Sequence, residues 1–127
     1  MASKAFLFLL TLAFAQEGHP LVGSWHGNWG RDANARQDLT LVMDWDGKQV
    51  TGLVNPGLDQ MPLLNAKLTP KDWSVHFEVD QKMNGRTVRC TADGKIDKLG
   101  SDRRTLTGTW TCGTDKGDFK LTRDRDY

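Results

Sequence analysis

The sequence lacks an excess of charge of either sign. Its 127 residues include 17 Lys and Arg against 16 Asp and Glu, and the formal net charge at pH 7 is +1. The basic and acidic side chains are interspersed and form no stripe of one sign. Nucleic acids attract proteins through a basic excess, so we expect no nucleic-acid partner.

The sequence also lacks the motifs of common catalytic and cofactor sites. It has no glycine-rich phosphate loop and no nucleophilic-serine motif, and its three histidines are scattered. Asp44 and Asp46-Gly47 resemble the start of a calcium-binding loop, but the remaining ligands are missing. We therefore assign no catalytic residue, no metal site and no cofactor.

No hydrophobic run is long enough to cross a bilayer as a helix, which takes about 20 apolar residues. A short run, Ala5 to Leu12, follows Lys4 and precedes Ala13-Phe14-Ala15, as in a secretory signal peptide. We predict a signal peptide over residues 1–15 and a secreted or periplasmic domain over 16–127, with no membrane anchor after processing. An uncleaved anchor or a buried N-terminal helix is the alternative.

Helical periodicity is missing after residue 20, where apolar and polar residues alternate instead. Short connections such as Asp46-Gly47, Asn84-Gly85 and Asp115-Lys116-Gly117 require neighbouring strands to run antiparallel. We predict an all-β fold, an eight-stranded antiparallel up-and-down β-barrel, with a β-sandwich as the alternative. The predicted strands are 21–30, 37–45, 48–55, 63–69, 72–80, 86–97, 104–112 and 118–123. In this register all five tryptophans face inward, including Trp73.

The chain has two cysteines, Cys90 and Cys112. If they face each other across a hairpin, Gly94 faces Gly108 and the turn falls at residues 98–104. This register also matches inward residues with inward residues, so we predict a disulfide, as is common in exported proteins. Two free buried thiols are the alternative.

Closure of the barrel requires the last strand to pair with the first. Placing Arg123 beside Trp25 puts Phe119 beside Trp29. An inward arginine needs a partner, which the face of Trp25 or nearby carbonyl groups would supply. The alternative is that Arg123 leaves the barrel and meets water.

Three short motifs resemble the calycin superfamily of lipocalins and avidin-like proteins. They are Gly23-Ser24-Trp25 in the first strand, Thr107-Gly108-Thr109-Trp110, and Arg123 near the end. The resemblance implies a ligand-binding barrel in which Arg123 packs over Trp25 in a structural role. The family's ligands do not carry over, because Gly27 stands where avidin-like proteins have an Asn, and the length and helix of lipocalins are missing.

The longer predicted loops, 30–36, 55–62, 81–85 and 113–117, lie at one end of the barrel, which we expect to be its mouth. Apolar walls with a few polar rim groups suit a small hydrophobic ligand. The predicted ligand-binding residues are Trp29, Leu39, Val54, Asn55, Phe77, Trp110 and Phe119. Further rim candidates are Arg31, Gln60 and Asn84.

Other functions remain open at this point. The interior of an eight-stranded barrel is just wide enough for its own side chains to fill. A filled barrel would favour a protein-interaction or structural module, such as an inhibitor, an adhesion module or an assembling subunit, and an oligomer is then possible. A small-barrel isomerase or cyclase is the enzymatic alternative, but the predicted inward faces carry no Asp, Glu or His.

Overall fold

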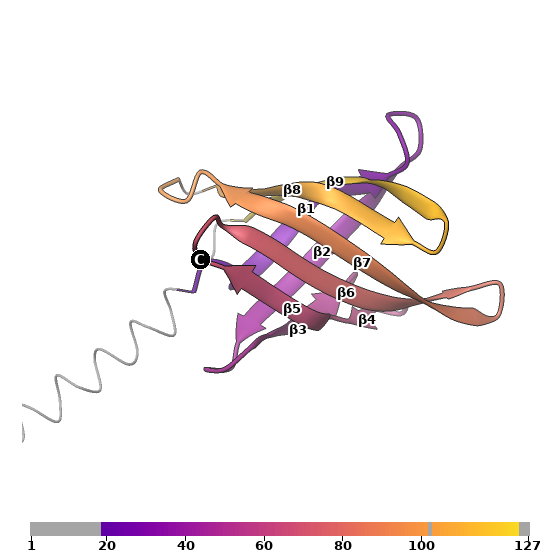
Figure 1. Ribbon diagram of the computed structural model, residues 1–127, viewed down its shortest axis with the longest axis horizontal. Coiled ribbons are helices and arrows are strands. Elements are labelled where there is room, and N and C mark those ends of the chain that lie inside the picture. Colours follow the sequence, from indigo (N-terminus) through magenta and orange to yellow (C-terminus); the bar gives the residue numbers. More distant parts are fainter. Residues whose placement is uncertain (1–18, 102, 125–127) are drawn as a thin grey trace, which may run out of the picture.

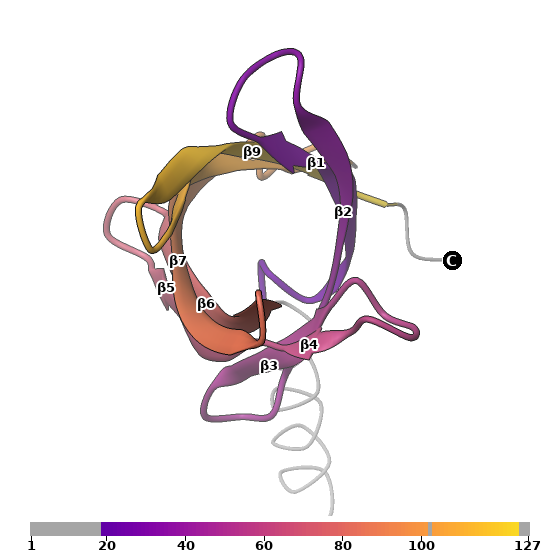
Figure 2. The same cartoon turned by 90° about the vertical axis from the view of Figure 1, so that its right-hand side faces the viewer.

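The strands form one antiparallel β-sheet that curls into a barrel (Figure 1, Figure 2). The computed structural model describes residues 19–101 and 103–124, so the predicted signal peptide lies outside the described residues. The sheet order is β4-β3-β2-β1-β9-β8-β7-β6-β5. The strands are β1 (Gly23–Gly30), β2 (Arg36–Trp45), β3 (Val50–Val54), β4 (Met61–Pro62), β5 (Leu64–Thr69), β6 (Ser74–Met83), β7 (Arg86–Asp97), β8 (Thr105–Cys112) and β9 (Asp115–Arg123).

The predicted all-β, up-and-down antiparallel fold is confirmed, with nine strands instead of eight. The additional strand is β4, which pairs with β3 through Val54↔Met61 and Leu53↔Pro62. Two residues are too few to show an alternating pattern, and Pro62 has no N–H to donate. This segment was therefore predicted as a loop.

Both predicted strand registers are confirmed. β7 pairs with β8 through Cys90↔Cys112 and Gly94↔Gly108, and a disulfide joins the cysteines, whose Cα atoms are 4.3 Å apart. That distance suits a directly opposed pair without mutual hydrogen bonds, for which about 4.5 Å is typical. The β1–β9 pairing that closes the sheet has the partners Trp25↔Arg123, Gly27↔Leu121 and Trp29↔Phe119.

The hairpin turns follow their local chemistry, and one was predicted wrongly. Asn84-Gly85 forms the two-residue turn between β6 and β7, with both residues at positive φ (52° and 76°). The turn between β8 and β9 lies at Gly113-Thr114, and not at Asp115-Lys116-Gly117, because Cys112 already pairs with Asp115. Gly113 has a φ of 61°, which glycine adopts without strain.

Trp73 does not face the interior, contrary to the prediction from alternation. It ends the turn of residues 70–73, before β6 begins, and has a φ of 60°. Its side chain is among the exposed large apolar groups of the described chain. The alternation that predicted it as inward applies to extended backbone and fails at a left-handed residue.

The ring of strands has a seam between β3 and β5. The short β4 and β5 form the two ends of the sheet order. Leu63 lies between β4 and β5, and its N–H donates to the carbonyl of Gly52 at 2.9 Å, which continues the β3–β4 pairing up to the start of β5. The register between β5 and β6 also shifts between Leu64 and Lys67, which is a bulge next to this seam.

One end of the barrel, here called the base, carries the turns 46–49, 70–73 and 98–104 (the left side of Figure 1). Residues 19–22, here called the basal loop, form a turn there and not the start of the first strand, as was predicted from Leu21. Leu21 is fully buried, and its carbonyl accepts a 2.9 Å hydrogen bond from Nε1 of Trp25, which is also fully buried.

Two arginines bind the basal loop: Arg104, which directly precedes β8, and Arg123, which ends β9. Nη1 of Arg104 donates to the carbonyl of Pro20 at 2.9 Å, and Nη1 of Arg123 donates to the carbonyl of Val22 at 3.2 Å. Burial, together with the nearby charge of Arg123, lowers the pKa of Arg104. Arg123 therefore stays at the base as a partnered side chain and does not simply extend into water.

Replacing Leu21 by alanine tests how much the basal loop contributes to stability. We expect L21A to lower the free energy of unfolding by about 3 kcal/mol, because it leaves a cavity at a fully buried site. Urea denaturation measures this. L58A is the matched control: Leu58 is fully exposed (104 %), so the same change there should stay within about 0.5 kcal/mol. Equal stabilities for the two variants would show that Leu21 does not seal the base.

Candidate functional site

The opposite end of the barrel is its mouth, with the loops 31–35, 55–60, 84–85 and 113–114 around it. Figure 2 looks toward this end and shows the strands as a ring. Because the basal loop closes the other end, a cavity inside the barrel can be reached from the mouth.

A cavity of about 70 Å³ lies inside the barrel near the mouth. All seven predicted ligand-binding residues line it together: Trp29, Leu39, Val54, Asn55, Phe77, Trp110 and Phe119. Seven further residues that were not assigned to the ligand complete the lining: Met61, Val79, Gln81, Cys90, Thr91, Ala92 and Cys112. The register of alternating strands brings these residues from distant parts of the sequence to one place.

Aromatic side chains form two walls of the cavity. Trp29 and Trp110 meet edge to face with their ring centroids 4.8 Å apart, and Phe77 and Phe119 do so at 5.7 Å. Nε1 of Trp110 donates to the carbonyl of Asp118 at 3.1 Å, so its N–H is satisfied by the protein. The cavity therefore meets the faces and edges of four aromatic rings, and the N–H of Trp110 is already engaged.

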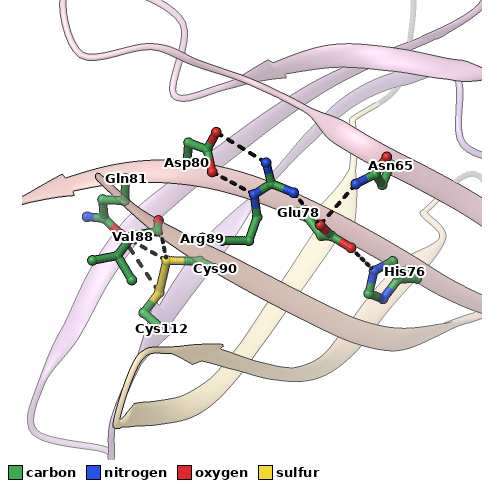
Figure 3. A network of polar contacts seen from close by, with 9 residues as sticks. All are labelled: Asn65, His76, Glu78, Asp80, Gln81, Val88, Arg89, Cys90 and Cys112. Atoms are coloured by element: carbon green, nitrogen blue, oxygen red, sulfur yellow. Dashed lines mark hydrogen bonds and ion pairs between the residues drawn. A yellow bond between two sulfur atoms is a disulfide. The ribbon is translucent and has the colours of Figure 1, made fainter. Parts of the chain in front are cut away.

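The polar groups in the lining are uncharged amides and a hydroxyl, from Asn55, Gln81 and Thr91. Oδ1 of Asn55 accepts the backbone N–H of Thr40 at 3.0 Å, which positions its amide NH₂ group as a donor. Oε1 of Gln81 lies 3.7 Å from Sγ of Cys90, beside the disulfide (Figure 3). Among the described residues that line the cavity, none carries a charge.

Sequence reasoning placed Gln81 in a loop because it ended the strand at Asp80. β6 continues to Met83, so the inward alternation through Phe77 and Val79 extends to Gln81. The alternation itself was the signal that could have found it. The predicted rim candidates Gln60 and Asn84 do not line the cavity. Oε1 of Gln60 accepts the N–H of Gly57, and Asn84 lies in the turn between β6 and β7.

Outside the cavity, at the mouth, a wider hollow of about 300 Å³ shares Trp29, Trp110, Gln81 and Cys112 with it. Arg31 and Asp115 line this vestibule and form an ion pair at 2.8 Å. Arg36 pairs with Asp118 close by. Arg31 and Arg36 are thus each paired with an aspartate at the mouth.

A polar network covers the outer face of β6 and β7, away from the cavity (Figure 3). Nε2 of His76 contacts Glu78 and Nδ1 contacts Asp93, each at 2.7 Å. Glu78 and Asp80 both bind the guanidinium of Arg89, at 2.8 and 2.6 Å. The hydrogen bond to Glu78, followed by that to Asp93, raises the pKa of His76, and the reciprocal bond from His76 is the main cause that lowers the pKa of Glu78 to about 2.

A second polar line on the outer face resembles a catalytic triad in composition. Nδ1 of His26 lies 3.1 Å from Oγ1 of Thr40, and Nε2 lies 2.8 Å from Oδ2 of Asp124. The backbone N–H of Thr40 already donates to Asn55, so it is not available to stabilise an oxyanion. The side chains of His26 and Asp124 are about half exposed, and neither lines the cavity, the vestibule at the mouth or the hollow at the base.

Over residues 19–101 and 103–124, no group of three or more His, Cys, Asp or Glu side chains is arranged to hold a metal ion. The same residues include no helix long and apolar enough to cross a membrane. The chain matches no protein-family model, no curated protein and no solved structure.

The His76 contacts lead to a pH-dependent prediction. Both ring nitrogens face carboxylates, which only a protonated imidazole satisfies, so the ¹H–¹⁵N NMR titration of His76 should give a pKa above 6.5, while burial keeps that of His19 below 6.5. Because the folded-state pKa is raised, the stabilisation from His76 is full below about pH 6.5 and is lost as the pH rises through the folded-state value. The stability lost in H76Q should therefore be larger at about pH 6 than at about pH 9. A His76 pKa below that of His19 would contradict this network.

Proposed function

We propose that this chain is an exported, calycin-like barrel that binds a small, uncharged apolar ligand inside the barrel. The observation that carries the proposal is the convergence of seven predicted residues on one cavity with aromatic walls and amide groups. Apolar cavities with a few placed polar groups are the usual form of small-molecule sites.

The charges around the site support an uncharged ligand. The cavity lining offers no ionic partner among the described residues, and the arginines at the mouth are paired with Asp115 and Asp118. A buried ionised group would lose its hydration without compensation there. Amide and hydroxyl groups can still orient a ligand that has a single hydrogen-bonding group.

The cavity volume limits the part of the ligand that is enclosed. About 70 Å³ is roughly half of an engineered apolar cavity of about 150 Å³ that binds benzene. The ligand that fits has a compact apolar end in the cavity and a remainder in the vestibule of about 300 Å³, next to Gln81.

The proposed export rests on the signal-peptide pattern of residues 1–15 and on the disulfide. Disulfides persist in oxidising compartments and are rare in reducing ones. The Cys90–Cys112 bond therefore accords with a secreted or periplasmic location.

Native mass spectrometry of the protein purified from its export compartment tests the proposal. We expect a protein mass that begins after Ala15, with an additional small mass that disappears on denaturation. The same spectrum records the oligomeric state. A bare protein that also takes up no apolar compound in a ligand screen would contradict the proposal.

A cavity-filling substitution gives the matched test. Ala92 lines the cavity opposite Trp110, so A92V adds two methyl groups to the space that the ligand would occupy. We expect ligand binding to be lost while the free energy of unfolding changes by less than about 1.5 kcal/mol. T87V is the control, because Thr87 is exposed on β7 and lines neither the cavity nor the hollows at the two ends. Unchanged binding in A92V would place the ligand elsewhere.

A protein-interaction module is the second candidate. The small cavity volume favours it, because little space is left between the aromatic side chains. The exposed threonine face of β8, Thr107, Thr109 and Thr111, offers a flat surface for a partner or a second copy. An interaction module predicts that native mass spectrometry gives the protein mass without a small ligand, together with peaks of an oligomer or a partner complex.

A further inference from the structure

A second hollow lies at the base, far from the mouth. It has a volume of about 400 Å³ and shares no lining residue with the barrel cavity. The basal loop, the turns 46–49 and 70–73, and the strand β5 surround it. We call it the basal groove. Its lining includes Trp45, Trp73, His19, Lys48 and Lys67.

Trp73 occupies a backbone position that does not suit tryptophan. Its φ of 60° is left-handed, and three of the four other non-glycine residues at positive φ are asparagines, which tolerate this region. The conformation is held in place, because the carbonyl of Trp73 accepts the N–H of Ile96 at 3.0 Å. The residue is 37 % exposed, so part of the indole remains open to solvent beside the groove. A strained, exposed aromatic residue beside a groove indicates a binding role.

Trp45 supplies a second flat surface in the same groove. Its ring stacks on that of His19, with centroids 4.5 Å apart and an interplanar angle of 18°. The stacking fixes the orientation of the indole against the basal loop. The groove therefore presents one aromatic ring from the end of β2 and one from the turn 70–73, and rings of this kind bind planar apolar groups by stacking.

The lining of the basal groove includes two basic side chains and no acidic one. Lys48 and Lys67 line it, and neither forms an ion pair with a residue in 19–101 or 103–124. Asp46 and Asp72 lie in the adjoining turns, where they accept backbone N–H groups, and they do not line the groove. At the mouth, by contrast, Arg31 and Arg36 form ion pairs with aspartates.

We propose that the basal groove is a separate binding site for a planar organic anion, whose ring stacks on Trp73 and Trp45 and whose acidic group meets Lys48 and Lys67. The site is independent of the proposed interior ligand. The two ends of the barrel differ in the ligand chemistry that they favour: uncharged at the mouth and anionic at the base.

The five indole N–H signals in a ¹H–¹⁵N NMR spectrum make the test direct. The probe is naphthalene-2-sulfonate, and the uncharged naphthalene-2-sulfonamide is its isosteric control. We expect saturable shifts of the Trp45 and Trp73 indoles with the sulfonate, weaker binding of the sulfonamide, and loss of affinity with added salt. Trp29 and Trp110 report on the barrel cavity, so binding there is distinguished in the same spectrum.

Two variants separate the groove from effects on folding. W73N places at this backbone position a residue that tolerates it, so we expect a folded protein that binds the sulfonate about tenfold more weakly. K98N is the control, because Lys98 has the same φ of 60° in another basal turn and does not line the groove. It should bind as the unmodified protein does.

The charge variant is K48Q/K67Q, which should weaken binding of the sulfonate about tenfold and leave the sulfonamide unchanged. K82Q/K116Q removes the same charge elsewhere and should have no effect. The proposal is overturned if the sulfonate shifts Trp29 and Trp110 alone, if sulfonate and sulfonamide bind equally well, if W73N binds as tightly as K98N, or if no saturable shift occurs up to the solubility limit of the probe.

Discussion

The hydrogen bond from the indole of Trp25 to the carbonyl of Leu21 is the contact on which the barrel depends. A fully buried indole N–H needs an acceptor, and the acceptor here belongs to a residue that is itself fully buried. This bond holds the basal loop against the interior of the barrel. Arg104 and Arg123 bind the carbonyl groups of Pro20 and Val22, on either side of Leu21. One end is closed in this way, so the cavity has a single mouth.

The distribution of charge follows from the same closed, apolar interior. Ionic side chains are confined to the outer face and the two rims, where His76, Glu78 and Arg89 form a network and the arginines at the mouth are paired (Figure 3). The lining of the barrel cavity offers aromatic rings and a few amide groups, whereas the lining of the basal groove also includes lysines, which is why we propose different ligands for the two hollows.

Alternation predicted both strand registers and placed seven of the fourteen residues that line the cavity, because burial on one face of a strand leaves a period of two. Three features were missed where the backbone is not extended. Leu21 lies in a turn, Trp73 is left-handed, and Gly113-Thr114 is shorter than the turn composition suggested. The conformations of Leu21 and Trp73 depend on tertiary partners, the indole of Trp25 and the N–H of Ile96, which no local pattern encodes. The ligand itself was not predictable, since shape and volume arise only when the strands assemble.

The number of hydrogen bonds between neighbouring strands differs around the barrel and is small at the seam between β3 and β5. Elsewhere, widening the ring would break a ladder of hydrogen bonds along the full length of two strands. At the seam, the chain passes from the two-residue β4 to β5 through Leu63. The short β3–β4 ladder and the bond from Leu63 to Gly52 hold this segment against β3, and a protein hydrogen bond contributes about 1 kcal/mol. Separating the strands here would therefore break fewer hydrogen bonds than separating two of the long strands.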